Sequence, residues 1–217
     1  MRHPATYTDC LLPVMADLLR GAHRILDPFG GTGKIFALGA LLPGAQIDAV
    51  EIEPEWAALD ARMTLGNALA LPWPAGTFDA ICTSPTYGNR MADHFEDHQA
   101  EKAYRRNTYR HALGRPLAAD NSGALQWGPE YREFHRRAWA EARRVLRPGG
   151  KFVLNIKDHI RGGERQRVTD WHALTLTDLG FSIFAWRDIA TPGQRYGQNG
   201  AARVPFESVI AFKLAAA

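Results

Sequence analysis

Short apolar runs alternate with amphipathic stretches along most of the chain, which has 217 residues. The apolar runs predict strands at 24–27, 46–51, 78–83, 152–156, 182–188 and 207–212. The amphipathic stretches between them predict helices at 10–20, 33–42, 54–63, 129–146 and 168–179. This alternation is typical of an α/β fold, in which a mainly parallel, doubly wound sheet carries helices on both faces. We therefore expect a single domain over 1–217.

Two segments do not follow the alternation. The connection at about 88–128 is longer than a compact domain normally carries without a purpose. The segment at about 191–205 is rich in glycine and contains Arg195 and Tyr196. In a parallel sheet both would leave from or near the carboxyl ends of strands, where ligands of open α/β sheets bind. We predict a substrate-recognition insertion at 88–128 and a second substrate loop at 191–205.

The composition is that of a folded domain, with 46% hydrophobic and 23% charged residues. Lys and Arg exceed Asp and Glu by 26 − 23 = 3, which is compatible with a polyanionic partner but does not require one. The longest stretch without a charged residue, 63–78, contains Pro72 and Pro74 and is too short to span a bilayer. The N-terminus lacks the unbroken apolar run of a secretory signal. We expect a cytoplasmic protein without a membrane helix.

The two cysteines, Cys10 and Cys82, lie far apart in the chain. No Cys-x-x-Cys or Cys/His spacing accompanies them, so neither a disulfide framework nor a zinc site is indicated. We expect no metal site and interpret both cysteines as core thiols.

A glycine-rich turn follows the first predicted strand and opens a helix, with the sequence Asp27-Pro28-Phe29-Gly30-Gly31-Thr32-Gly33. Glycines let the backbone approach a ligand where a Cβ atom would collide, which indicates a nucleotide-like cofactor. A phosphate-binding P-loop would need Gly in place of Pro28 and Ser or Thr in place of Ile35. A dinucleotide fingerprint would need a small residue in place of Phe36. The first alternative fails, and the second is weak.

The turn resembles the first motif of class I S-adenosylmethionine-dependent methyltransferases, in the Asp-Pro-Phe-x-Gly-x-Gly form of enzymes that methylate exocyclic amino groups of nucleobases. That resemblance implies a Rossmann-like, seven-stranded sheet and S-adenosylmethionine as cofactor. It places Glu51, followed by Ile52, where the family's acid accepts both ribose hydroxyls. It places Asn67 and Ala68 beside the adenine ring, with Asn67 replacing the usual Asp. A later run, Val145-Leu146-Arg147-Pro148-Gly149-Gly150, matches a helix–turn–strand of the same fold.

A second motif, Ser84-Pro85-Thr86-Tyr87, follows the predicted strand at 78–83. It resembles the Ser-Pro-Pro-Tyr catalytic motif of amino-directed DNA methyltransferases. An exocyclic amine shares its lone pair with the ring, so it becomes nucleophilic only when acceptors hold its hydrogens. The Ser84 hydroxyl and the Pro85 carbonyl would hold them and would stabilise the positive charge that develops on nitrogen. Tyr87 would stack on the target base after it leaves the helix.

Thr86 departs from the family pattern, in which a second proline stands at this position. A residue before proline is confined to extended conformations, which fixes the direction of its carbonyl. Pro85 lacks that constraint here. Either packing restores it, or activity is weak, or the chain uses another acceptor or has no catalytic role.

Basic residues gather behind the second motif, in a stretch without acids that contains Lys102, Arg105, Arg106, Arg110 and Arg115 beside Tyr104, Tyr109 and His111. Cations track phosphates while aromatic rings stack on unpaired bases, so this stretch is a candidate nucleic-acid contact. A solvated basic face is the alternative interpretation. Arg90 and the pair Arg195 and Tyr196 are further substrate-binding candidates.

Taken together, the motifs predict a methyltransferase acting on a base amino group, with DNA as its partner. Ser at the start of the second motif favours cytosine N4 over adenine N6. RNA is the alternative partner, because guanine N2 methyltransferases share this motif order. A catalytically silent subunit that binds the cofactor or nucleic acid is the alternative from another class.

Overall fold

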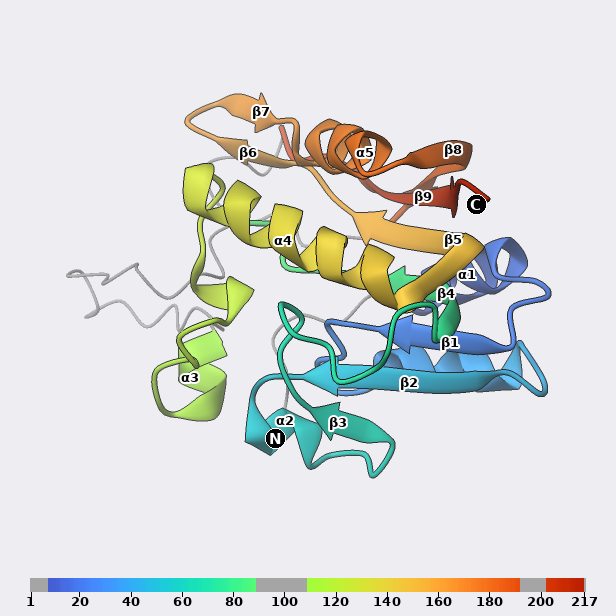
Figure 1. The fold of residues 1–217 in the computed structure, drawn as a ribbon. Coiled ribbons are helices and arrows are strands. Elements are labelled where there is room, and N and C mark those ends of the chain that lie inside the picture. Colours follow the sequence, from blue (N-terminus) through green and yellow to red (C-terminus); the bar gives the residue numbers. More distant parts are fainter. Residues whose placement is uncertain (1–7, 89–108, 192–201, 217) are drawn as a thin grey trace.

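A seven-stranded sheet lies at the centre of the computed structural model, which describes residues 8–88, 109–191 and 202–216. Its strand order is β3-β2-β1-β4-β5-β9-β8, and helices lie on both of its faces (Figure 1). The pairs formed by β1 to β5 are parallel, whereas β9 runs antiparallel to both β5 and β8. The predicted doubly wound, mainly parallel α/β sheet is confirmed.

The strands of this sheet are β1 (Arg24–Asp27), β2 (Gln46–Glu51), β3 (Met63–Leu65), β4 (Phe78–Thr83), β5 (Leu146–Ile156), β8 (Phe181–Ala190) and β9 (Phe206–Leu214). The α-helices are α1 (Leu12–Leu18), α2 (Pro54–Ala57), α3 (Tyr109–Leu113), α4 (Pro129–Val145) and α5 (Val168–Asp178). Three 3₁₀ helices are η1 (Asp9–Leu11), η2 (Lys34–Ala40) and η3 (Ser122–Ala124). A separate hairpin is formed by β6 (His159–Arg161) and β7 (Glu164–Gln166).

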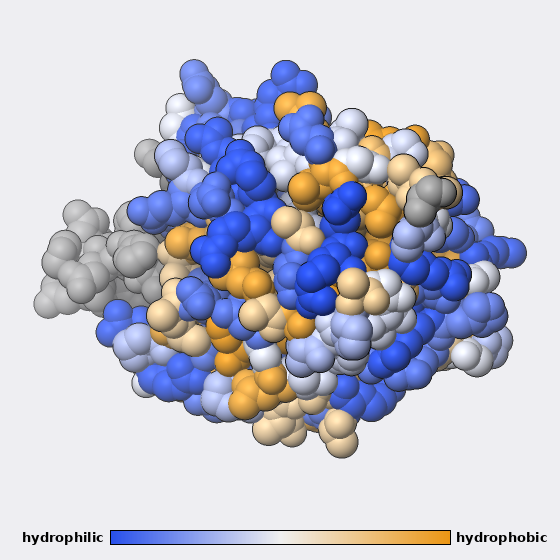
Figure 2. Space-filling model, viewed as in Figure 1, coloured by the Kyte–Doolittle hydropathy of each residue, from blue (hydrophilic) through white to orange (hydrophobic). Residues whose placement is uncertain are grey.

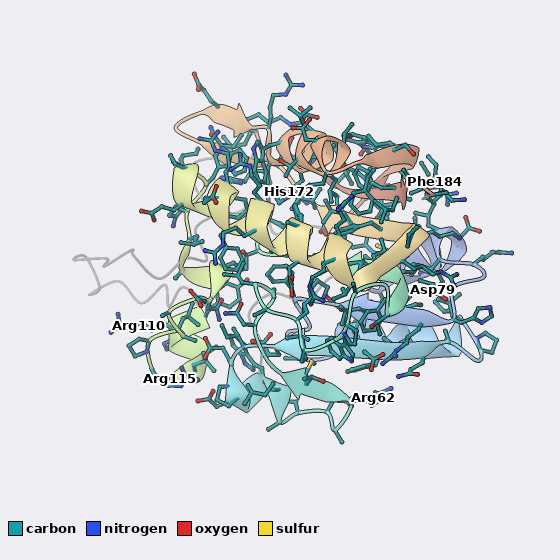
Figure 3. All side chains as sticks on the ribbon, viewed as in Figure 1. Arg62, Asp79, Arg110, Arg115, His172 and Phe184 are labelled. Atoms are coloured by element: carbon teal, nitrogen blue, oxygen red, sulfur yellow. The ribbon has the colours of Figure 1, made fainter. Side chains whose placement is uncertain are left out.

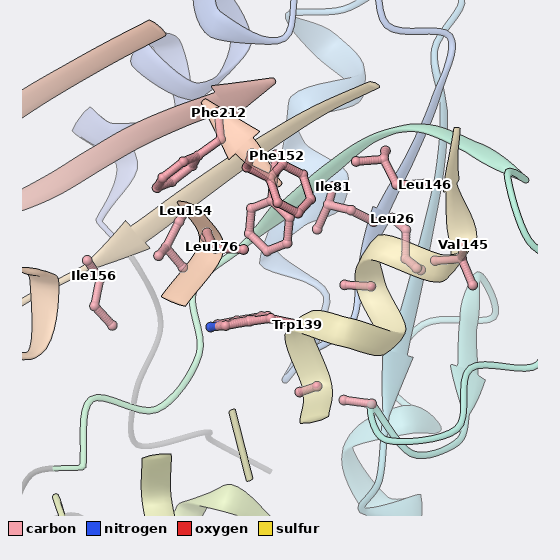
Figure 4. Packing of buried hydrophobic residues seen from close by; sticks show 14 of the residues in the cluster. Leu26, Ile81, Trp139, Val145, Leu146, Phe152, Leu154, Ile156, Leu176 and Phe212 are labelled. Carbon is pink, nitrogen blue, oxygen red and sulfur yellow. The ribbon is translucent and has the colours of Figure 1, made fainter. Parts of the chain in front are cut away.

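Alternating side chains of the strands enter two apolar cores, one on each face of the sheet. Leu26 and Ile81 face the core that contains α4 and α5, around the buried Trp139 (Figure 4). Their neighbours in the sequence, Ile25 and Cys82, point to the opposite face and enter the core that contains α1 and η2. All six residues of β4 are buried, as expected for a strand covered on both faces.

Several elements differ from the sequence prediction. The predicted helix at 54–63 ends at Ala57, because Asp60 forms a turn with the backbone N–H of Arg62 (3.0 Å) that competes with the helix. The chain then enters β3, which was not predicted. The predicted helix at 33–42 is the 3₁₀ helix η2. The unpredicted β6–β7 hairpin turns at Gly162 and Gly163, both with positive φ.

The surface carries some residues that the sequence pattern assigned elsewhere. Cys82 is buried as predicted, but Cys10 is exposed, so its interpretation as a core thiol is wrong. The face in Figure 2 is mostly hydrophilic, with apolar residues in scattered patches. None of the helices formed by the described residues combines the length and apolar character that crossing a bilayer requires.

The fully buried Glu53 carboxylate, in the loop after β2, binds residues 115–121 of the long insertion. Its Oε2 accepts from Arg115 Nη2 (2.7 Å), and its Oε1 accepts from the backbone N–H of Ala118 (2.8 Å) and from Asn121 Nδ2 (2.7 Å). Arg115 also pairs with Glu55, and it lies beside α3 in Figure 3. These bonds join segments more than 60 residues apart in the chain.

Replacing Arg115 by Ala would leave the buried Glu53 carboxylate with one partner fewer. We expect Arg115→Ala to lower the free energy of unfolding by about 1–3 kcal/mol, the cost of an uncompensated buried polar group. Arg136 pairs with Glu133 at the exposed surface of α4, so Arg136→Ala serves as the matched control, with an expected loss below about 0.5 kcal/mol. Urea unfolding measures both; equal losses would contradict the anchoring role of Arg115.

Candidate functional site

The two sequence motifs meet because β1 and β4 are parallel neighbours in the sheet. The glycine-rich turn leaves the carboxyl end of β1, and Ser84 to Tyr87 leave that of β4. Both line one cavity of about 260 Å³. The predicted site residues in its lining are Pro28, Phe29, Gly30, Gly31, Thr32, Glu51, Ile52, Asn67, Ala68, Ser84, Pro85, Thr86 and Tyr87. Asp27 and Gly33 do not belong to that lining.

Asp27 connects the two motifs from below the cavity. Its Oδ1 accepts from the hydroxyl of Thr83 (2.6 Å), the residue before Ser84, and from the backbone N–H of Phe29 (2.9 Å). Asp27 is only 1% exposed, and its Oδ2 has no hydrogen-bond partner. Burial raises the pKa of Asp27 to about 7, although the bonds from Thr83 and Phe29 act in the opposite direction. Asp27 thus positions both turns.

The glycine turn packs tightly against β2 and β3. The Gly30 N–H donates to the Val50 carbonyl (2.7 Å), and a Cβ atom on Gly30 would lie 2.6 Å from the Met63 sulfur. A side chain at this position would therefore force Met63 to shift. The Glu51 carboxylate accepts from the backbone N–H of Gly31 and of Glu53, each at 2.9 Å. Burial raises the pKa of Glu51 to about 7, against the lowering effect of those two bonds.

Asn67 closes another side of the cavity. Its Oδ1 accepts from the backbone N–H of Leu69 (2.9 Å), which forms the turn. Its Nδ2 donates to Asp120 Oδ2 (3.0 Å), and Asp120 also lines the cavity. A carboxylate at position 67 would be repelled by Asp120. The acid missing from the turn is therefore present nearby, on the insertion.

The Ser84 hydroxyl belongs to a polar cluster that includes two residues the sequence analysis missed, Asn155 and Glu207. Ser84 Oγ lies 3.0 Å from the Tyr87 hydroxyl, which donates to Glu207 Oε2 (3.1 Å). Asn155 Nδ2 lies 3.2 Å from Ser84 Oγ, 2.9 Å from the Tyr87 hydroxyl and 2.9 Å from Glu207 Oε2. A polar Asn inside the apolar run 152–156 was a usable signal for such a site.

The backbone of the second motif is held at Thr86. Its carbonyl accepts from the Tyr131 hydroxyl (2.6 Å), and its own hydroxyl lies 3.0 Å from Ser122 Oγ. Tyr131 in turn lies 2.9 Å from Nε2 of His172, which is seen on α5 in Figure 3. Trp139 Nε1 donates to His172 Nδ1 (2.9 Å), so the Nε2–H of His172 donates to Tyr131. Hydrogen bonds here restrain a segment that lacks the second proline.

This chain of donors requires a neutral His172. Burial lowers the pKa of His172 well below its ordinary value, and the neighbouring His135 adds to the effect. Burial also lowers the pKa of His135 to about 3. His135 stacks on Phe29 with ring centroids 5.8 Å apart, so the same aromatic cluster supports both turns.

The predicted substrate residues Arg90, Lys102, Arg105, Arg106, Arg195 and Tyr196 all lie outside the described residues. Two residues of the basic stretch, Arg115 and Tyr109, contact other parts of the described chain. Arg115 is engaged by Glu53 and Glu55, and Tyr109 is buried against Trp56, with ring centroids 5.9 Å apart. Arg115 is thus held by two carboxylates in this structure, and a nucleic-acid contact by the basic stretch stays a prediction. Within the described ranges, no three His, Cys, Asp or Glu residues form a group that could hold a metal ion.

No protein-family model matches the sequence, and no curated protein matches it. Solved structures do resemble it. The [4+2]-cyclase SpnF is 17% identical, with a TM-score of 0.60 over 96% of this chain and 81% of that one. An S-adenosylmethionine-dependent methyltransferase from Methanosarcina mazei is 15% identical, with a TM-score of 0.59 over 94% and 98%. Geranyl diphosphate methyltransferase, in complex with GPP and sinefungin, is 13% identical, with a TM-score of 0.59 over 94% and 78%.

These likenesses establish the Rossmann-like methyltransferase fold, which confirms the fold that the sequence resemblance implied. A cyclase stands among the neighbours, so the fold does not by itself determine the reaction.

Asp27→Asn tests the buried carboxyl that joins the motifs. The pKa of Asp27 in the folded protein lies above the unfolded value of about 3.9, so its stabilising contribution is fully present below pH 4 and is lost as the pH rises to about 7. The variant does not titrate at this position. The free energy of unfolding of the variant, relative to that of the wild type, should therefore increase by roughly 2–4 kcal/mol as the pH rises from 4 to 7.

Urea unfolding across that pH range measures the difference. A pH-independent offset between the two proteins is compatible with the account, because the buried amide of the variant lacks a partner. Two parallel pH curves, in which that offset is the only difference between the proteins, would contradict it.

Proposed function

We propose that this chain is an S-adenosylmethionine-dependent methyltransferase that acts on an exocyclic amino group of a DNA base, with cytosine N4 favoured over adenine N6. The observation that carries the proposal is the shared cavity. A glycine turn and Glu51 form one side of it, and Ser84 to Tyr87 form another. A cofactor and an amine bound against these two sides would meet within the cavity.

The residues at the glycine turn fit the cofactor. Gly30 brings the backbone close to β2, where a Cβ atom would press on Met63 and Ala49, and this close approach leaves the cavity open. Glu51 presents a carboxylate with two acceptor oxygens, which suits a pair of ribose hydroxyls. S-adenosylmethionine, when bound, supplies a methyl group on a sulfonium sulfur. Glu51, Ile52, Asn67 and Ala68 would hold its adenosine part.

The second motif would bind and polarise the amine. Tyr87 donates its hydrogen to Glu207, so the Ser84 hydroxyl hydrogen is directed to the Tyr87 oxygen. Asn155 occupies one lone pair of Ser84 and leaves the other for an amine hydrogen. The Pro85 carbonyl would take the second hydrogen. Both acceptors would then stabilise positive charge on nitrogen as the methyl group is transferred.

The choice of a nucleobase amine rests on the Ser-Pro-Thr-Tyr turn, because the fold also occurs in geranyl diphosphate methyltransferase. The Tyr87 ring lines the cavity beside Ser84 and could stack on a base that has left its helix. The hydrogen bond from Tyr131 fixes the Thr86 carbonyl, one peptide beyond the Pro85 carbonyl that the missing proline would have restrained, so the turn is held at the next residue instead.

Methyl transfer from labelled S-adenosylmethionine tests the function. We expect label in duplex or single-stranded DNA and none in RNA. Label in RNA alone would overturn DNA as the acceptor. No label in any polymer, despite measurable cofactor binding, would overturn the enzyme assignment.

Two variants separate the two sides of the cavity. Ser84→Ala should lower transfer by about 100-fold or more, the usual effect of removing a transition-state contact, with cofactor affinity nearly unchanged. Glu51→Ala should mainly weaken cofactor binding. Because the pKa of Glu51 is about 7, the affinity of the wild type should rise as the pH increases through 7, and Glu51→Gln should abolish that dependence. Calorimetric titrations from pH 5.5 to 8.5 decide this; a cofactor affinity independent of pH in the wild type would contradict the role of Glu51.

A further inference from the structure

Ser84, Tyr87, Asn155 and Glu207 form a polar cluster that the second motif alone does not explain. Asn155 comes from β5, and Glu207 from the beginning of β9. Because β9 runs antiparallel to β5, its first residues lie at the sheet edge where the parallel strands end. Ser84, Tyr87 and Glu207 also line the cavity. A carboxylate therefore stands beside the proposed amine site.

The hydrogen bonds in this cluster have a defined direction. An ionised Glu207 can only accept, so Tyr87 donates to Glu207 Oε2 over 3.1 Å. The Tyr87 oxygen then accepts from Ser84, 3.0 Å away. The fully buried Asn155 points its amide nitrogen at all three oxygens, which keeps them together and leaves its own Oδ1 without a partner. The hydrogen bonds therefore all point the same way: Ser84, at the cavity, donates to Tyr87, and Tyr87 donates to Glu207.

We propose that this cluster is a proton relay, in which Glu207 receives the proton released by the methylated amine through Tyr87 and Ser84. The inference rests on the proposed function. As the N–C bond forms, the bond between the methyl carbon and sulfur breaks and its electron pair stays on sulfur. The cationic nitrogen gives a proton to Ser84 Oγ, Ser84 gives its proton to the Tyr87 oxygen, and Tyr87 gives its proton to Glu207. The product is a neutral amine beside a protonated carboxyl.

Other titratable groups in the described part of the cavity are less suited to this task. Glu51 is bound to the N–H groups of Gly31 and Glu53 on the cofactor side, and Asp120 is bound to Asn67. Burial raises the pKa of the Tyr87 hydroxyl well above its ordinary value, so Tyr87 passes a proton on and does not stay ionised. Glu207 acts through Tyr87 and Ser84 and is therefore a positioning residue and final acceptor.

Charged and polar groups face Glu207 from several elements. Lys157, which follows β5, interacts electrostatically with Glu207, and Arg203 lies within electrostatic range of Lys157. The Lys157 ammonium donates to Thr191 Oγ1 (3.0 Å), which holds it at the end of β8. Tyr87 donates to the carboxylate from the turn after β4, and Asn155 donates to it from β5.

The test measures single-turnover methyl transfer in Glu207→Gln, Tyr87→Phe and the double variant. The acceptor is the polymer that takes up label in the experiment with labelled S-adenosylmethionine. Tyr87→Phe keeps the ring but removes the relay hydroxyl. Each single variant should lose about 100-fold in rate, the lower limit of general acid–base effects, with cofactor affinity within threefold of wild type. Because both residues serve one relay, the double variant should be no slower than the slower single variant. Glu164→Gln, at the exposed β6–β7 hairpin, is the matched control and should transfer at the wild-type rate.

The pH profile separates a relay from a merely structural role. At saturating cofactor, which removes the effect of Glu51 on binding, the wild-type rate should fall at acid pH, and Glu207→Gln should lose that acid limb. Formate added to Glu207→Ala should restore part of the rate. A Glu207→Gln rate within threefold of wild type, while Ser84→Ala is inactive, would overturn the relay and leave the function intact; additive losses in the double variant would also overturn it. If Glu207→Gln fails to fold, Tyr87→Phe decides alone, and an unchanged rate overturns the relay. Absence of transfer by the wild type would instead overturn the proposed function.

Discussion

The hydrogen bond from Thr83 to Asp27 is the interaction on which the site depends. It joins the last residues of β1 and β4, and each of these residues is followed at once by one of the two turns. The parallel pairing of the strands brings their ends to the same edge, but pairing alone leaves the turns free to diverge. The buried Asp27 carboxyl also holds the Phe29 N–H, so one side chain fixes where both turns begin.

A second restraint acts further along the catalytic turn, where the family places a proline and this chain has Thr86. Proline restrains its neighbour by excluding conformations. Here Tyr131 binds the Thr86 carbonyl, and His172 and Trp139 orient Tyr131. The steric restraint on Pro85 is absent, and the turn is held instead at Thr86 by a hydrogen bond that depends on a packed core and a neutral histidine. The aromatic cluster around α4 thus both packs the core and holds the catalytic turn in place.

The central strands and the two turns could be predicted because their signals are local: apolar runs, glycines and short motifs. The edge strand β3 has only three residues, and a turn at Asp60 replaces a helix that the pattern favoured. Asn155 left a local signal, as a polar residue within an apolar run, but Glu207 could not be assigned to the site, because only the sheet topology brings the antiparallel β9 to the ends of the parallel strands. The pairing of Arg115 with Glu53 could not be predicted, because the two residues lie 62 positions apart in the chain.

The central claim is that the glycine turn and the Ser84–Tyr87 turn form a single site for a cofactor and its acceptor. A crystal structure with S-adenosylhomocysteine tests this most directly. The account predicts the ribose hydroxyls on Glu51 and the sulfur in the cavity between Gly30 and Pro85. A ligand bound elsewhere, or a glycine turn that binds the phosphates of a nucleoside triphosphate instead, would contradict it.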